Sequence, residues 1–465
     1  MAPFKNPFTA FLTVSTTLSC PFSKSRTHLL ATSLLLLSFL FLSTSLTNHS
    51  SSFSASALAS RLFFAALYIS PFSSVKSSNT CLVSDLHDNC TLSSVTAMER
   101  SRRNSRKEET DQNSRLSSCD IFNGDWVVDD YGPIYKPGSC PYVDDAFNCF
   151  KNGRPDQGYL GFRWKPHGCR IPRFDGRKML EMLKEKRLVF VGDSLNRNMW
   201  ESLVCALRES LKNKSRIFEV SDRREFKTQG FYSFKFIDYN CSIDFVKSPF
   251  LVQEWKASDR NGTKRETLRL DMIQGTSTKY NDADIIIFNT GHWWTHQKTF
   301  KGKDYFQEGN HVYNRLQVTE AYTKALGTWA QWVDAKIDTS HTRVFFRGYS
   351  ASHFRKGQWN SGGHCDGEKQ PITNGSDLAP YPWMMSILES VISEMKTPVF
   401  YLNITKMTDY RKDGHPSIYR QPETKRTKEI IQDCSHWCLP GVPDSWNELL
   451  YATLLLSHRN LSNHH

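Results

Sequence analysis

A repeated alternation between short apolar runs and helical patterns, which begins near residue 186, constrains the fold most strongly. The apolar runs are bounded by Gly, Asn or polar residues, as is typical of parallel strands buried on both faces; they are 187–191, 285–288, 343–346 and 399–402. The helical patterns between and after them cover 195–211, 319–337, 383–395 and 445–457. Strands that alternate with helices predict an α/β fold, a doubly wound sheet with helices on both faces.

Two regions depart from this alternation. Residues 226–273 are rich in aromatic and β-branched side chains and predict an antiparallel β insertion. Residues 118–172 contain four cysteines, several Gly/Pro turns and many aromatic residues, which predicts a small Cys-rich N-terminal subdomain. The main domain then covers 173–465.

The cysteines indicate disulfides and not a metal site. The chain has 12 cysteines without a C-x-x-C motif or any repeated zinc-ligand spacing, so we expect no metal. Spacing does not decide which cysteines pair. Nine lie from Cys119 onward, so at least one is free or pairs outside that region.

An apolar segment near the N-terminus predicts a membrane anchor. Residues 29–46 carry no charge over 18 positions, just enough to span a bilayer. Basic residues precede the segment at Lys5, Lys24 and Arg26, so the positive-inside rule places residues 1–28 in the cytosol and the rest in a lumen. A cleaved signal peptide is the alternative.

The region after the anchor is predicted to be a disordered stem. Residues 47–117 are Ser-rich and then charged, with little periodicity. Eight N-x-S/T sequons agree with a lumenal glycoprotein, namely Asn48, Asn89, Asn213, Asn240, Asn261, Asn374, Asn403 and Asn460.

The charge of the chain argues against nucleic-acid binding. The formal net charge is +12, but no Lys/Arg stripe with interleaved aromatic residues occurs. A mild positive field suits an acidic polymer, and it equally serves to keep the protein soluble.

Two separate stretches supply a candidate hydrolase-type triad. Gly192-Asp193-Ser194 lies between an expected strand and an expected helix, where Ser194 is either a helix cap or a nucleophile. A Ser nucleophile needs a base and an orienting group, and Asp433 and His436 lie three residues apart near the C-terminus. That spacing allows a carboxylate and an imidazole to share one side of a turn.

Residues after two other strands are candidates for the rest of the site. Asn289 follows one strand, where its amide can donate to an oxyanion. His292, Trp293 and Trp294 come next. Two adjacent Trp residues either belong to a core or stack on sugar rings. Ser350, beside His353, is a rival nucleophile after another strand. It lacks a closely spaced carboxylate and is interpreted as a cleft wall or substrate contact.

Together these motifs resemble a known family. The order Gly192-Asp193-Ser194, a central Asn/Gly strand end and Asp433-x-x-His436 is similar to that of SGNH/GDSL hydrolases. More specifically, the chain resembles the plant trichome birefringence-like family, in the subgroup around the protein that gives the family its name. The stretches that carry this resemblance include "CDIFNGDWVVDD", "GFRWKPHGC", "LVFVGDSLNRNMWESLVC", "FNTGHWWTH", "FFRGYSASHFRKGQWNSGGHCDGE" and "DCSHWCLPGVPDSWNELL".

The resemblance implies a type II Golgi membrane protein that O-acetylates cell-wall polysaccharides such as xylan or pectin. It implies that Ser194 is the nucleophile, His436 the base and Asp433 its orienter, with Ser194 N–H and Asn289 at the oxyanion. Arg197 would assist that pocket or bind substrate. It implies no bound cofactor, with acetyl-CoA or an acetylated carrier as the co-substrate that supplies acetyl.

Two other functions are compatible with the sequence. The same triad serves an acetylesterase, because only the second acceptor differs, water in place of a sugar hydroxyl. A non-catalytic protein that binds or bridges wall polysaccharides such as pectin is the third hypothesis. The intact Ser/Asp/His set argues against it, since a binder does not need a triad.

Overall fold

A mixed sheet forms the centre of the protein. The computed structural model describes residues 119–462 except 222, 224–225, 227–229, 259–263, 296 and 428–430. Within them, seven strands form this sheet in the order β13-β12-β9-β3-β6-β5-β4. The first five strands run parallel, and β5 and β4 continue the sheet antiparallel. Their bounds are β13 Val399–Leu402, β12 Arg343–Arg347, β9 Ile285–Phe288, β3 Arg187–Gly192, β6 Cys241–Lys247, β5 Phe231–Phe236 and β4 Ile217–Glu219.

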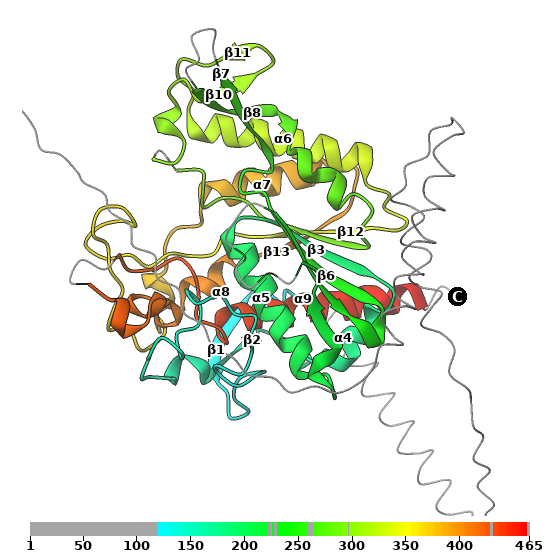
Figure 1. Ribbon diagram of the computed structural model, residues 1–465, viewed down its shortest axis with the longest axis vertical. Coiled ribbons are helices and arrows are strands. Elements are labelled where there is room, and N and C mark those ends of the chain that lie inside the picture. The colour runs from blue at the N-terminus through cyan, green and yellow to red at the C-terminus, as the bar shows by residue number, and fades with distance from the viewer. Residues whose placement is uncertain are drawn as a thin grey trace, which may run out of the picture. The chain divides into compact units, whose positions relative to one another are not determined.

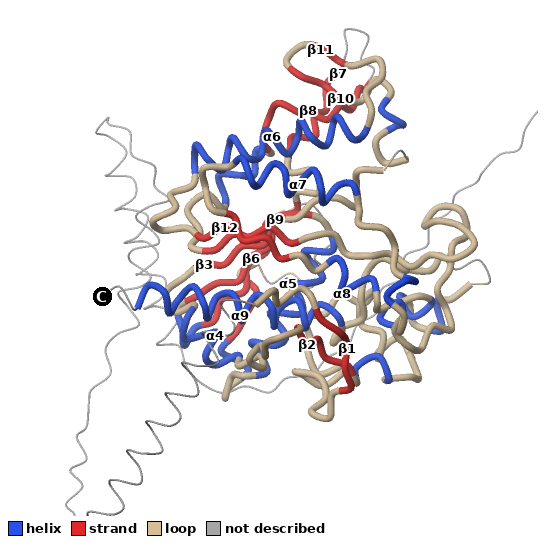
Figure 2. The backbone as a smooth tube through the Cα atoms, turned by 180° about the vertical axis from the view of Figure 1, so that it is seen from behind, coloured by secondary structure: helices blue, strands red, loops and turns tan. Residues whose placement is uncertain are grey.

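Helices cover both faces of the sheet, as the alternation predicted (Figures 1 and 2). Leu188 and Phe190 of β3 pack in one core cluster with α4, α5 and α9, whereas Val189 and Val191 pack in a second cluster with α6 and α7. Successive side chains of a strand point to opposite faces, so an uninterrupted apolar run can serve two cores. The helices are α4 Gly176–Met182, α5 Ser194–Glu209, α6 Val318–Lys336, α7 Trp383–Glu394, α8 Thr405–Asp409 and α9 Val442–Ser462.

The predicted insertion at 226–273 divides between two sheets. The expectation is correct for β7 Val252–Ser258 and β8 Lys264–Ile273, which pair antiparallel in a second sheet with β10 Phe306–Glu308 and β11 His311–Val312. β6 pairs antiparallel with β5, as predicted, but it also pairs parallel with β3, so this part of the segment belongs to the main sheet. β6 is buried over almost its whole length. A strand without a solvent-facing side belongs in the interior of a sheet, which explains its position.

The N-terminal segment is tied to the main domain as well as to itself. It contains one antiparallel pair of strands, β1 Gly124–Val128 and β2 Phe162–Pro166. The disulfide Cys119–Cys169 closes the segment, whereas Cys140–Cys205 and Cys149–Cys438 join it to α5 and to the chain before α9. A fourth bond joins Cys365 to Cys434, and among the described cysteines only the buried Cys241 is free.

The membrane-anchor prediction stays a prediction. The predicted tail, anchor and stem all lie outside the described residues. Among the helices of the described part, none combines the length and the apolar character that a bilayer crossing requires.

The Cys140–Cys205 bond provides a test of how much the N-terminal segment stabilises the fold. It links positions 65 residues apart, so it removes much conformational freedom from the unfolded chain. We expect Cys140→Ala with Cys205→Ala to lower the free energy of unfolding by about 2–4 kcal/mol, measured by chemical denaturation. Cys241→Ala, which removes a buried thiol without a disulfide, is the matched control. An equal loss in both proteins would contradict a cross-linking role.

Candidate active site

The Gly192-Asp193-Ser194 turn connects β3 to α5 at the carboxyl end of the sheet. Asp193 caps α5, since its carboxylate accepts the Leu195 N–H at 2.9 Å. Gly192 is required because a Cβ there would lie 1.9 Å from Asn289 Oδ1. Ser194 is the first residue of the helix, where backbone N–H groups lack intrahelical acceptors and can bind an oxyanion.

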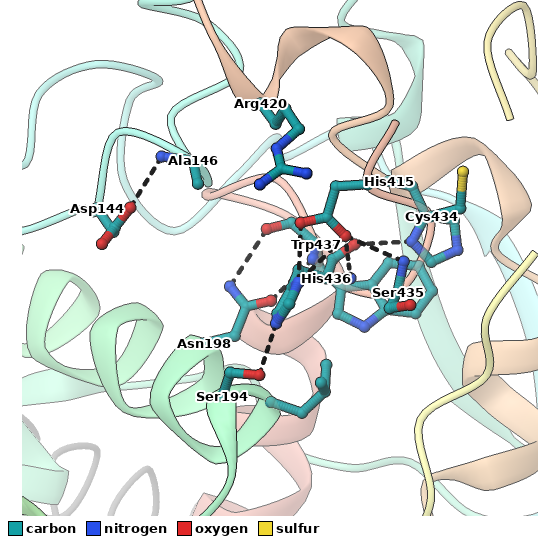
Figure 3. A network of polar contacts seen from close by, with 12 residues as sticks. Asp144, Ala146, Ser194, Asn198, His415, Arg420, Cys434, Ser435, His436 and Trp437 are labelled. Carbon is teal, nitrogen blue, oxygen red and sulfur yellow. Dashed lines mark hydrogen bonds and ion pairs between the residues drawn. The ribbon is translucent and has the colours of Figure 1, made fainter. Parts of the chain in front are cut away.

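Ser194, His436 and Asp433 meet in the geometry of a hydrolase triad. Figure 3 shows the Ser194 side chain directed at the His436 ring. His436 Nε2 lies 2.7 Å from Ser194 Oγ, and His436 Nδ1 lies 2.8 Å from Asp433 Oδ2. The carboxylate also accepts the backbone N–H of His436 at 3.0 Å, which closes a tight turn and fixes the ring. This arrangement keeps the Nδ1 proton toward Asp433 and leaves Nε2 to accept the Ser194 proton.

Asp433 is held as a carboxylate although it is buried. Burial alone would raise its pKa, but the charge and hydrogen bonds of His436, together with Arg420, hold the pKa of Asp433 well below its usual range. An ionised Asp433 stabilises the imidazolium that forms when His436 accepts a proton.

Asn198, which the sequence reasoning missed, joins the nucleophile helix to the base. Its side chain accepts the Trp437 N–H at 2.8 Å and donates to the Trp437 carbonyl at 3.2 Å. Asn198 lies four residues after Ser194 and therefore on the same face of α5. That spacing was the available signal, and Figure 3 shows both side chains directed toward the turn.

Two disulfides flank the base. Cys434 is bonded to Cys365 and Cys438 to Cys149, so the turn that carries His436 is fixed on both sides. The Phe147 ring of the N-terminal segment packs on the His436 ring, with centroids 5.2 Å apart. The N-terminal segment thereby forms part of the wall behind the base.

Asn289 lies in a buried polar cluster beneath the turn. It donates to Asp193 Oδ1 at 2.8 Å and accepts the Asp193 N–H at 3.1 Å. In this structure its amide holds the turn, and the oxyanion contact predicted from the sequence stays a prediction.

An arginine and a histidine accompany this cluster. Arg347 Nη2 lies 3.9 Å from Asp193 Oδ1, and His292 Nδ1 lies 3.5 Å from Asp193 Oδ2. Burial raises the pKa of Asp193, but His292, Arg347 and Asn289 outweigh it and hold that pKa well below its usual range. Burial lowers the pKa of Arg347 to about 10, which leaves the guanidinium charged at neutral pH.

The substrate contact predicted for Arg197 is wrong. Its guanidinium is buried, bonded to Asp144 at 3.0 Å and to Glu201 at 2.8 Å, and it lies over the Phe147 ring. Burial raises the pKa of Glu201 to about 8, so the two acids do not both carry charge at neutral pH. Arg197 supports the N-terminal segment against α5.

Most of the other predicted substrate contacts are internal. Trp294 is 2% exposed and bonds Thr290, Ser350 is fully buried and accepts the Trp437 indole N–H, and His292 Nε2 lies 2.8 Å from the Ser350 carbonyl. His353 contacts a second histidine, His415. Trp294 and Ser350 are therefore buried away from substrate, whereas His292 and His353 are partly exposed and each contact another protein group.

Trp293 is also partly exposed, beyond the end of β9. The ammonium of Lys298 lies 4.2 Å from its ring centroid. In the part of the chain that is described, no group of three or more His, Cys, Asp or Glu side chains is placed to hold a metal.

Comparisons with known proteins agree with this geometry. Residues 171–453 match the GDSL/SGNH-like Acyl-Esterase family found in Pmr5 and Cas1p, and residues 117–170 match the PMR5 N terminal Domain. Protein trichome birefringence-like 4 of Arabidopsis thaliana is 61% identical over 425 residues, which cover 90% of this chain and 91% of that protein. Protein trichome birefringence of the same plant is 57% identical over 75% of this chain and 58% of its own length.

The Asp193 cluster gives a pH-dependent prediction for stability. Because its pKa is lowered on folding, Asp193 contributes stability that is present above its ordinary value of about 4 and is lost as pH falls. We expect Asp193→Asn to cost about 1–3 kcal/mol at pH 7, and the difference from the wild type to narrow below about pH 4.

Denaturant unfolding at several pH values between 7 and 3 measures this difference. Asp238→Asn is the control, because Asp238 forms an exposed ion pair with Arg216 that contributes little. A wild-type advantage that stays constant down to pH 3 would show that the ionised carboxylate is not the source of the stability.

Proposed function

This chain belongs to the trichome birefringence-like family, and we propose that it is an O-acetyltransferase that acylates hydroxyl groups of a plant cell-wall polysaccharide. The observation that carries the proposal is the contact of His436 Nε2 with Ser194 Oγ at 2.7 Å, while Asp433 orients the same ring. The matched acyl-esterase domain supports ester chemistry of this kind.

In the first half of the reaction, Ser194 takes the acetyl group. His436 accepts the hydroxyl proton as Ser194 Oγ attacks the carbonyl carbon of the donor. The backbone N–H of Ser194, at the positive end of α5, stabilises the oxyanion. The intermediate collapses to acetyl-Ser194, and the leaving group departs with the proton from His436.

In the second half, a sugar hydroxyl takes the place of the leaving group. His436 removes its proton, the sugar oxygen attacks the acetyl carbon, and the Ser194 oxygen leaves and recovers the proton. The enzyme returns to its starting state, and the acetyl ester has moved to the polysaccharide. The donor is acetyl-CoA or an acetylated carrier, and the scheme needs no metal.

We place the acceptor beside Trp293. β9 neighbours β3, so the loop after β9 lies next to Ser194, and Trp293 presents a partly exposed indole there. Indole faces stack on the apolar faces of sugar rings. The Lys298 ammonium lies between the rings of Trp293 and the exposed Trp359, at 4.2 and 5.4 Å from their centroids, and suits a polymer that bears some carboxylates such as substituted xylan or pectin.

We further propose that the protein is a single-pass type II protein of the Golgi membrane with a lumenal catalytic domain. Support comes from the uncharged residues 29–46 and the basic residues that precede them. Disulfides form in such an oxidising compartment, and four are present among the described residues.

An acetylesterase is the second candidate, favoured by the description of the matched family as acyl-esterases. The two activities share acetyl-Ser194 and differ in whether water or a sugar hydroxyl attacks it. Release of free acetate without gain on any acceptor polymer would select the esterase. The non-catalytic binder is disfavoured by the assembled triad, which a binding role does not require.

The nucleophile is tested with Ser194→Ala in the full chain. Incubation with labelled acetyl donor and a panel of deacetylated polymers, followed by mass measurement of product acetyl, should show at least about a 10³-fold lower rate. Ser340→Ala is the matched control, since Ser340 is an exposed serine before β12. Unchanged transfer by Ser194→Ala would overturn the proposal.

The acceptor site is tested with Trp293→Ala. Loss of one stacking surface should raise KM for the polymer about tenfold and leave hydrolysis of a small acetyl ester within about twofold, because the triad is intact. Trp255→Ala removes an exposed indole from β7 and serves as the control. Equal effects of both variants on KM would remove Trp293 from the acceptor site.

A further inference from the structure

Two histidines that take no part in the triad lie directly behind the catalytic turn. His353 Nδ1 lies 2.7 Å from His415 Nε2. The outer nitrogens each face a backbone carbonyl, His353 Nε2 the Asp409 oxygen at 2.9 Å and His415 Nδ1 the His436 oxygen at 2.7 Å. The His353 side chain is 12% exposed and His415 is 2% exposed, so water does not replace these partners readily.

The contacts of this pair fix the number of its protons. A carbonyl oxygen only accepts, so each outer nitrogen carries a hydrogen. The two inner nitrogens need one more proton between them, because two lone pairs at 2.7 Å would repel. Three protons on two imidazole rings give a net charge of +1. With only two protons, one of the three hydrogen bonds is lost inside the protein, and this loss costs free energy.

We propose that His353 and His415 form a singly charged dyad that positions the catalytic turn, a role that rests on the proposed function of His436. His415 Nδ1–H donates to the carbonyl of His436 itself, and the His415 ring stacks on Trp437 with centroids 4.1 Å apart. The backbone N–H of His353 donates to the Cys434 carbonyl at 3.0 Å. The two residues therefore hold the main chain of the catalytic turn at Cys434 and at His436, on either side of Ser435.

The two rings differ in their burial and in their charged neighbours. Burial, and next the adjacent His353, hold the pKa of His415 well below its usual value, so His415 is the neutral partner that accepts the inner proton. Asp409 Oδ1 of α8 lies 3.5 Å from His353 Nε2 and favours the cation there. Both residues act through His436 and are positioning residues.

Several other charged groups surround the dyad. Asp433 and His436 face it from the catalytic turn, the former favouring and the latter opposing its charge. Arg154 of the N-terminal segment donates to the His415 carbonyl at 3.1 Å. As the pH rises, the dyad loses its third proton, one contact breaks, and the turn loses a constraint. The rate should then fall on the alkaline side.

Two substitutions at His353 separate this role from simple packing. Asn can donate an amide N–H near the position of Nδ1 but does not titrate, whereas Leu fills similar volume without a donor. We expect His353→Leu to lower kcat about tenfold with KM within about twofold, as loss of a charged hydrogen bond predicts. His353→Asn should recover kcat to within about threefold of the wild type and lack the alkaline fall of the wild type. Leu and Asn variants with the same kcat and the same pH profile would overturn the proposal.

A spectroscopic measurement separates failure of this inference from failure of the proposed function. In the full chain with ¹⁵N-labelled histidine, the inner N–H should give a strongly deshielded proton signal that couples to a histidine nitrogen. The signal should be present in Ser194→Ala, which is inactive, and absent in His353→Leu. Its absence from the wild type at pH 6 would overturn the dyad, whatever the activity of Ser194→Ala. An active Ser194→Ala protein that retains the signal would overturn only the reaction scheme.

Discussion

The candidate site depends on the two covalent bonds on either side of His436. The base lies 242 residues after Ser194, on a short turn outside any helix or strand. A turn of this kind has little cohesion of its own, because it lacks the regular backbone hydrogen bonds of a helix or a strand. The bonds Cys365–Cys434 and Cys149–Cys438 fix both of its ends, and Asn198 joins its centre to α5. The distance from His436 to Ser194 is therefore set by cross-links and not by the sheet alone.

One consequence is that the N-terminal segment belongs to the catalytic apparatus. It supplies Cys149 to one of those bonds and Phe147 to the wall behind His436, and its Arg154 reaches the main chain at His415. Asp144 completes the buried pairing of Arg197 on the nucleophile helix. The two matched domains thus share one core at the site, so loss of the segment would remove packing directly from the base.

The sequence predicted the parts of the site whose positions follow from local rules. Strand ends, the start of α5 and the i,i+3 spacing of Asp433 and His436 are local, and they were correctly read from the sequence alone. The predictions that failed concern the direction in which side chains point. Trp294, Ser350 and Arg197 follow strands or lie on α5, as expected, but their side chains face the interior. A residue at a strand end can point to a cleft or to a core, and only the tertiary partners (Thr290, Trp437 and Asp144) decide which. The pairing of the cysteines and the parallel pairing of β6 with β3 also depend on residues that are far apart in the sequence.

The buried charges around the triad have a shared logic. Asp193 is paired with Arg347 and His292, Asp433 with His436, and His353 lies against Asp409. A site whose charges are already oriented does not need to reorganise when charge develops on the oxyanion and on His436. The same rigidity means that the triad does not choose between water and a sugar hydroxyl. That choice falls to the more exposed rim formed by the loop after β9, where Trp293 and Lys298 lie. In the proposed reaction, a polysaccharide bound at this rim would exclude water from acetyl-Ser194, so the acceptor site itself would make the enzyme a transferase.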